Sequence, residues 1–104
     1  MIRISVMYGN GEGKKFDYDY YAGKHMALVH KRLDGRGLIR SEVDRGLAGG
    51  APGAPAPCLA IGHLYFKSFE EFQAAIQPHA KELFDDVPNF TNILPQVQVS
   101  EILG

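Results

Sequence analysis

The chain has 104 residues, a formal net charge of −1 and a hydrophobic fraction of 45%. This length supports a single domain over residues 1–104 with one core, and the near-neutral charge gives no reason to expect nucleic acid or an anionic membrane as a partner. The lone cysteine excludes an intramolecular disulfide and fits a reducing interior, and the N-terminal stretch is too short and too interrupted for a signal peptide or a membrane span. We therefore expect a cytoplasmic protein.

The first part of the chain predicts a strand followed by a helix. Residues 2–8 alternate between apolar and other side chains, which is the period of a strand. Residues 9–13, Gly-Asn-Gly-Glu-Gly, tolerate positive φ and end that strand. Asp17 is a suitable N-cap, and we expect a helix from there to about Leu33, where Asp34-Gly35 stops it.

The middle of the chain predicts two strands joined by an irregular loop. The alternation resumes at Leu38 and continues to about Leu47. Residues 48–57 are too rich in glycine and proline for regular structure, and too few residues flank them for an interdomain linker, so we interpret them as a loop inside one domain. Residues 58–66 form a nearly continuous apolar run, which is typical of a strand buried on both faces.

The last third predicts a second helix and a final strand. Ser68 and Glu71 form a capping box that opens the helix, and Pro78 interrupts it. Residues 88–92 are a turn-rich connector, and the following strand contains Val97 and Val99. The order βαββαβ is the α+β, ferredoxin-like pattern: a four-stranded antiparallel sheet with two helices on one face.

This topology has a consequence for assembly. The first and third strands lie in the centre of the sheet, and the helices cover only one of its faces. The apolar run 58–66 nevertheless carries apolar side chains on both sides, so a monomer would expose a larger apolar patch than soluble monomers usually carry. A symmetric dimer that packs sheet on sheet removes this exposure. We therefore predict a homodimer through the sheet face, a dimeric α+β barrel.

Tyr21 and His25 are the leading candidates for a catalytic pair. They are four residues apart on the expected helix and therefore share a face. Imidazole titrates near neutral pH and can act as a general acid or base, and a neighbouring phenol can orient a substrate oxygen. The alternative is that both side chains close the core between helix and sheet, with their polar atoms satisfied by the backbone.

Further polar residues are candidates for contacts with a substrate: Tyr20, His63, His79, Asn89 and Asn92. His63 interrupts an apolar strand, where an unpaired polar group would cost about 1–3 kcal/mol, so it needs either a hydrogen bond in the core or a ligand. We expect no metal, because His25 and His30 lack the i, i+4 spacing of a helical zinc pair and the chain has one cysteine; the alternative is a site assembled from the separated His25, His63 and His79. The glycines of residues 9–13 lack the fingerprints of phosphate-binding loops, and we expect no cofactor.

Four separated segments resemble the EthD family of small bacterial proteins, and together they cover essentially the whole chain. They are Phe16-Asp17…Tyr20-Tyr21…His25-Met26…Leu28, residues 45–57, Ala60-Ile61-Gly62-His63-Leu64 and Pro88-Asn89-Phe90-Thr91-Asn92-Ile93. The family pattern commonly has proline where this chain has Ala27, and we expect alanine to leave a smoother helix after His25. The family is named for clusters that degrade ethyl tert-butyl ether, and it belongs to the dimeric α+β barrel superfamily.

The resemblance implies a homodimer with a small apolar pocket. Relatives across the superfamily include cofactor-free monooxygenases, lactone isomerases and polyketide cyclases. One hypothesis is therefore a cofactor-independent oxidoreductase or isomerase that acts on a small hydrophobic metabolite in ether or aromatic degradation. The rival is a non-enzymatic accessory protein that binds a hydrophobic ligand for a partner oxygenase, and a third possibility is an assembly module whose polar residues are structural.

Overall fold

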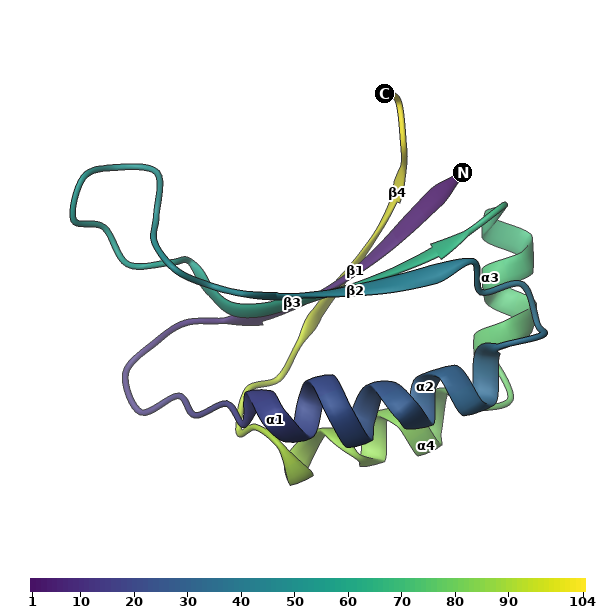
Figure 1. Cartoon of the computed structure of the whole chain (residues 1–104), viewed down its shortest axis with the longest axis horizontal. Helices are drawn as coiled ribbons and strands as arrows, with labels where there is room; N and C mark the ends of the chain where they lie inside the picture. The colour runs from purple at the N-terminus through teal and green to yellow at the C-terminus, as the bar shows by residue number, and fades with distance from the viewer.

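The computed structural model describes all of residues 1–104 and shows an antiparallel sheet with helices on one face (Figure 1). The four strands are β1 (Ile2–Gly9), β2 (Arg40–Arg45), β3 (Cys58–Phe66) and β4 (Gln96–Glu101). Their order across the sheet is β2-β3-β1-β4, so the first and third strands are central, as the sequence predicts. This is the ferredoxin-like α+β arrangement. The sheet is open, and no helix is long and apolar enough to cross a membrane.

The first helical segment contains a π turn. It consists of α1 (Tyr18–Tyr20), the π turn η1 (Tyr21–His25) and α2 (Met26–Leu33). Asp17 is the N-cap and accepts a hydrogen bond of 3.0 Å from the backbone N–H of Tyr20. Within η1 the N–H of Met26 reaches the carbonyl of Tyr21, one residue further than in an α-helix. The expectation of one uninterrupted α-helix is therefore corrected: α2 is regular after His25, but the turn that ends at His25 is widened.

The second helical segment follows its sequence signals closely. It comprises α3 (Phe69–Ile76), α4 (Ala80–Asp85) and the short 3₁₀ turn η2 (Val87–Asn89). The Ser68 hydroxyl accepts from the N–H of Glu71 at 3.2 Å, which confirms the predicted cap. The break between α3 and α4 spans Pro78, which cannot continue the hydrogen-bonding pattern of the helix.

The core lies between the sheet and the helices, and aromatic side chains dominate one part of it. The rings of Tyr8, Phe16, Tyr21 and Phe90 all meet within 5.0–5.7 Å of one another, centroid to centroid. A glycine in the central strand makes room for this cluster, since a Cβ atom on Gly62 would overlap the hydroxyl of Tyr21. The close approach of a phenol explains a residue that is otherwise unfavourable in the interior of a strand.

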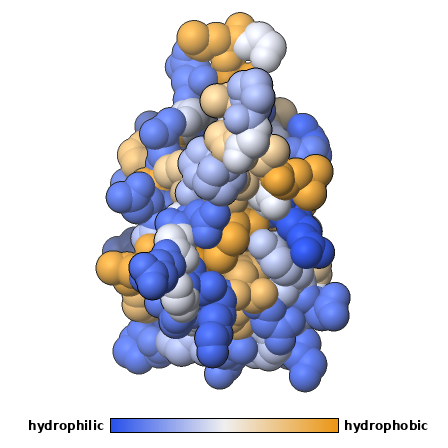
Figure 2. All heavy atoms as spheres, turned by 90° about the vertical axis from the view of Figure 1, so that its left-hand side faces the viewer, coloured by the Kyte–Doolittle hydropathy of each residue, from blue (hydrophilic) through white to orange (hydrophobic).

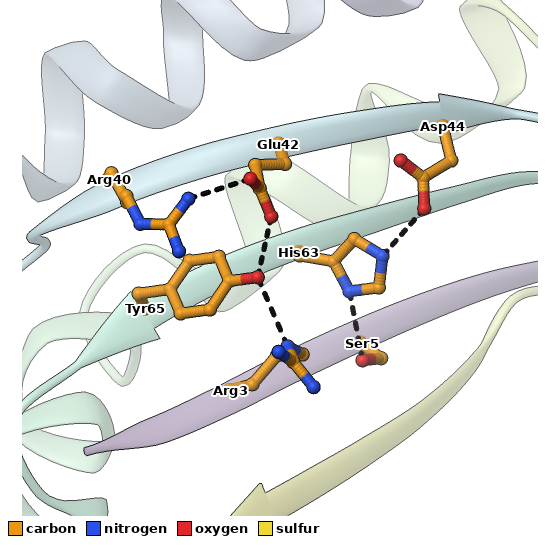
Figure 3. A network of polar contacts seen from close by, with 7 residues as sticks. All are labelled: Arg3, Ser5, Arg40, Glu42, Asp44, His63 and Tyr65. Atoms are coloured by element: carbon orange, nitrogen blue, oxygen red, sulfur yellow. Dashed lines mark hydrogen bonds and ion pairs between the residues drawn. The ribbon is translucent and has the colours of Figure 1, made fainter. Parts of the chain in front are cut away.

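The face of the sheet away from the helices is less apolar than the sequence suggests (Figure 3). Tyr65 is only 3% exposed, because the Arg40 guanidinium lies 4.0 Å from the centre of its ring and Arg3 donates to its hydroxyl at 3.1 Å. The Tyr65 hydroxyl donates in turn to Glu42 at 2.5 Å. The expected apolar row on this face is thus partly a polar network, which corrects the premise used to predict the dimer.

Candidate functional site

A cavity of about 180 Å³ lies between the sheet and the helices. Strands β1, β3 and β4 line it from one side, and η1, α2, α3 and α4 from the other. The side chains around it are almost all apolar; the exceptions that reach it are the His25 imidazole and the phenols of Tyr8 and Tyr21. In the end view of Figure 2, apolar atoms reach the surface in the middle of the molecule, above a largely hydrophilic lower part. Such a concave apolar site with a few convergent polar groups is typical of small-molecule binding.

His25 is buried, and its two ring nitrogens have different surroundings. Nδ1 lies 2.8 Å from Oδ2 of Asp86. Because an ionised carboxylate can only accept, this contact places the hydrogen on Nδ1. The only hydrogen bond of the ring is the one through Nδ1, so Nε2 makes none within the protein, and the residue lines the cavity. The lone pair of Nε2 is thereby available to a ligand.

Two further groups hold Asp86 in place behind His25. The Tyr20 hydroxyl and the Asn89 side-chain amide donate to Oδ1 at 2.7 Å and 2.9 Å. Partial burial acts to raise the pKa of the Asp86 carboxyl, but the hydrogen bonds from Asn89, His25 and Tyr20 outweigh it and hold that pKa below its ordinary value. Asp86 is therefore an anion that orients the imidazole and would stabilise its protonated form.

The phenols of Tyr8 and Tyr21 face the same cavity. Tyr21 stacks on His25 with ring centroids 5.7 Å apart and packs edge-on against Tyr8 at 5.5 Å. The hydroxyls of Tyr18, Tyr20 and Tyr65 each donate to a group in the protein, whereas those of Tyr8 and Tyr21 do not. Burial raises the pKa of both phenols above the ordinary value, and for Tyr21 the nearby Tyr8 and Asp44 add to it. Both groups are therefore neutral donors, as a ligand oxygen would require.

The structure assembles only part of the residue set expected from the sequence. Tyr21 and His25 border the cavity, whereas Tyr20 and Asn89 lie behind His25 and bind Asp86. Asn92 instead joins two loops, accepting from the N–H of Lys15 and donating to the carbonyl of Gly13, both at 3.0 Å.

The other two expected histidines have separate environments. His63 borders the cavity from β3, but its imidazole lies on the opposite face of the sheet, bonded to Ser5 at 3.1 Å and to Asp44 at 2.8 Å (Figure 3). His79 precedes α4 outside the cavity lining, and its Nε2 is buried without a partner. No three His, Cys, Asp or Glu side chains lie together in a group that could hold a metal ion.

Two functional groups were missed by sequence reasoning, Tyr8 and Asp86. Tyr8 belongs to the apolar row of β1, where its hydroxyl gave no separate signal. Asp86 follows Asp85 at the C-terminal end of α4, where the helix dipole disfavours negative charge. That unfavourable placement was the available signal that this carboxylate serves another purpose.

Comparison with known proteins finds similarity over nearly the whole chain. The model of the EthD domain matches residues 10–93. The chain is 40% identical to an EthD-like protein of Ralstonia eutropha JMP134, with a TM-score of 0.92 over 99% of this chain and 92% of the other. An ethyl tert-butyl ether (EthD) family protein of Bacillus halodurans C-125 is 20% identical, with a TM-score of 0.74 over 99% of both chains, and supports the fold alone. Among curated proteins, none matches the chain.

Proposed function

The chain belongs to the EthD family, and we propose that it is a cofactor-independent enzyme that moves a proton on a small hydrophobic carbonyl compound. One observation supports this proposal most directly: Nε2 of His25 and the hydroxyls of Tyr8 and Tyr21, none of which bonds within the protein, belong to residues that line a single apolar cavity. If these residues served only to fill the core, we would not expect two hydroxyl donors and one imidazole acceptor without partners around the same cavity. Polar groups inside a protein that lack a hydrogen-bond partner are unfavourable for folding.

The roles follow from the protonation states. Nε2 of His25 takes a proton from a carbon next to the carbonyl, so a C–H bond breaks and an N–H bond forms. The electron pair moves onto the carbonyl oxygen, where the hydroxyls of Tyr8 and Tyr21 donate to the developing negative charge. The carboxylate of Asp86 stabilises the imidazolium. Return of the proton to another carbon gives an isomer. Attack of the enolate carbon on a second carbonyl of the same molecule forms a C–C bond and closes a ring, and the resulting alkoxide takes the proton back from the imidazolium.

The size of the cavity limits the substrate. A cavity of about 150 Å³ in an unrelated protein holds benzene, and this one measures about 180 Å³. The substrate is therefore a compound with one substituted ring or a branched chain of similar bulk. A place in ether degradation extends to this chain what the name of the Bacillus relative, an ethyl tert-butyl ether family protein, says of that protein, whereas an aromatic substrate is proposed from the volume of the cavity. If the enolate carbon instead reacts with dioxygen, a C–O bond forms to give a hydroperoxide, and loss of water from it leaves one oxygen atom as a new carbonyl, which is a monooxygenase reaction of a CH₂ group. Reactions run with and without oxygen distinguish this outcome from proton transfer alone.

We also propose that the protein acts as a homodimer joined through the open face of the sheet. The dimer buries the half-exposed side chains of Leu59 and Ile61 together with the polar network around Tyr65. Light scattering should return a mass of about twice 11.5 kDa. A single-chain mass at micromolar concentration would contradict this assembly.

The test of function is solvent exchange at carbon. Cyclic ketones, lactones and hydroxyaromatic compounds are incubated with the protein in D₂O, and deuterium incorporation is followed by NMR. We expect incorporation with the wild type and a fall of roughly 10²–10⁴-fold in His25→Ala, the usual contribution of a general base. Asp86→Asn should lower the rate as well, because it weakens the orientation of the imidazole. His30→Gln is the matched control, since His30 lies outside the cavity lining.

Two results would overturn the enzymatic proposal. Exchange that persists in His25→Ala would remove the histidine from the reaction. Saturable binding of these compounds without exchange, abolished by filling the cavity through Val29→Phe, would assign the protein to the accessory role of holding a hydrophobic ligand for a partner oxygenase.

A further inference from the structure

Residues 46–57 form an arm that projects from the sheet between β2 and β3. In Figure 1 this arm rises at the end of the sheet, on the side away from the helices. Its two limbs are bonded to each other, with the N–H of Gly49 donating to the carbonyl of Ala54 at 2.8 Å, and Asn10 fixes its base through the carbonyl of Ala56 at 3.0 Å. A Cβ atom on Gly49 would lie 2.9 Å from that of Ala54, so the limbs approach closely. Hydrogen bonds within the protein therefore hold the arm in this conformation.

The surface of this arm is unusual for an exposed segment. No Asp, Glu, Lys or Arg occurs between Arg45 and His63. Leu47, at the start of the arm, is 89% exposed. In Figure 2, which faces this end, pale and orange spheres dominate the upper middle of the surface. Exposed loops are ordinarily polar, and a projecting apolar one marks an interaction surface.

The open face of the sheet indicates which partner the arm meets. Register places Glu42 and Asp44 of β2 in the same rows as Gln98 and Gln96 of β4, at opposite edges of the sheet. A two-fold axis parallel to the strands lays β2 of one copy over β4 of another. Each carboxylate then faces a glutamine amide that can donate to it.

The side chains of the two central strands, β1 and β3, support the same two-fold axis. Ile61 shares a row with Met7, so these two apolar side chains face each other across the two-fold axis. An axis at right angles to the strands through the row of Glu42 would set that carboxylate against its own copy, which is unfavourable. The pattern of charge and polarity therefore fits a second copy of this chain with strands running along the axis.

The arm is long enough to embrace this second copy. Packed sheets lie about 10 Å apart, whereas a limb of about six residues spans up to roughly 20 Å. The arm and the first residue of β4 lie at the same end of the sheet. The last residues of β1 show this, because Gly9 pairs with Cys58, where the arm rejoins the sheet, and Met7 pairs with Gln96, where β4 begins. In the dimer it would therefore run past the second sheet at its β4 edge, beside Leu94 and Pro95. Leu94 is 75% exposed, and Pro95 borders the cavity.

We propose that the arm of each copy clasps a second copy of this chain docked on the open sheet face, packing along its β4 edge beside Leu94 and Pro95, the second of which lines the cavity. This inference rests on the homodimer proposed above and adds that each ligand site receives part of its wall from the other subunit.

Sedimentation equilibrium tests the clasp. Leu47→Lys should raise the dissociation constant of the dimer by about tenfold or more, as loss of a buried apolar anchor does. Replacement of residues 48–56 by Asn-Gly should have at least the same effect. Ala27→Lys adds the same charge on the exposed surface of α2 and should leave the constant unchanged. Circular dichroism checks that each variant is folded.

Disulfide trapping tests where the arm lies. In a Cys58→Ser background, a chain with Leu47→Cys is mixed with one carrying Leu94→Cys and oxidised. A covalent dimer of the two different chains is expected, and Ala27→Cys in place of Leu94→Cys should give none. A wild-type dimer whose constant is unaffected by Leu47→Lys, or mixed chains that do not cross-link, would overturn the clasp. The homodimer would stand in either case, whereas a monomeric wild type would overturn both. Deuterium exchange dependent on His25 is measured separately and decides the proposed function.

Discussion

Replacement of Gly62 by alanine should disturb the site through one contact. Gly62 lies in the middle of the central strand β3, and a Cβ atom there would overlap the hydroxyl of Tyr21 and lie 3.3 Å from its Cζ atom. The hydroxyl must therefore move, and it can do so only by shifting the ring within the aromatic cluster or into the cavity. Either movement changes the position of the donor that we assign to the substrate oxygen.

The expected change in the free energy of unfolding is the difference between a destabilising and a stabilising effect of the substitution. Overpacking a core position typically costs about 1–3 kcal/mol. Alanine in place of glycine inside a strand returns roughly 0.5–1 kcal/mol through the smaller entropy of the unfolded chain. The net loss of stability should be about 1–2 kcal/mol. In a Tyr21→Phe background the overlapping oxygen is absent and the nearest remaining contact is the ring carbon at 3.3 Å, so the same substitution should be neutral or slightly stabilising.

A double-mutant cycle measured by urea unfolding isolates this contact. The four proteins are the wild type, Gly62→Ala, Tyr21→Phe and the double variant, and we expect a coupling free energy of about 1–2 kcal/mol between the two positions. Tyr21→Phe alone should leave stability unchanged or raise it slightly, because it removes the overlap-prone hydroxyl without breaking a hydrogen bond in the protein. Equal losses from Gly62→Ala in both backgrounds would refute the reasoning, since the damage would then come from the strand and not from the phenol.

Three further predictions concern pH and helix capping. The raised pKa of Tyr8 and Tyr21 means that their contribution to stability is complete below pH 10.0 and declines above it, by up to about 1.4 kcal/mol per pH unit for each phenol; urea unfolding between pH 8 and 11 measures this slope, and Tyr21→Phe should reduce it. The lowered pKa of Asp86 gives stability that is present above pH 3.8 and is lost as pH falls through the folded-state value, and the Asp86→Asn variant should lack this part of the acid dependence in the same assay. Ser68→Ala should cost about 1 kcal/mol by removing the cap of α3, and Ser68→Asp, which restores an acceptor, should recover most of it in thermal unfolding.

The fold could be predicted from the sequence because local signals determine most of it. Alternation in β1, the cap at Asp17, the capping box at Ser68 and the break at Pro78 each depend on neighbouring residues. The π turn could not be predicted from the sequence. The choice between an i→i+5 and an i→i+4 hydrogen bond depends on how the ring of Tyr21 packs against its neighbours, and these neighbours are distant in the sequence.

Only the pair Tyr21 and His25 of the candidate site was predictable from the sequence. Tyr21 and His25 lie on one turn, so their spacing brings them together. Asp86 is sixty-one positions from His25 in the sequence, and only the tertiary fold places its carboxylate, at the end of α4, against Nδ1. His63 shows the opposite failure: its strand was identified, but the side of the sheet that it occupies depends on register, and a shift of one residue reverses it.

The contact between Gly62 and Tyr21 also bears on why this cavity has polar groups at all. A chain selected only for a stable core would gain by placing alanine in the central strand and phenylalanine at position 21, which removes the overlap and an unpartnered hydroxyl together. This chain instead combines a glycine that weakens the strand with a phenol whose hydroxyl, unlike those of Tyr18, Tyr20 and Tyr65, donates to no group in the protein. Both features are unfavourable for folding, and both place a neutral donor beside the free nitrogen of His25. Such a combination is expected where the missing hydrogen-bond partner is a ligand, which is why the cavity and not the packing of the aromatic cluster explains these two residues.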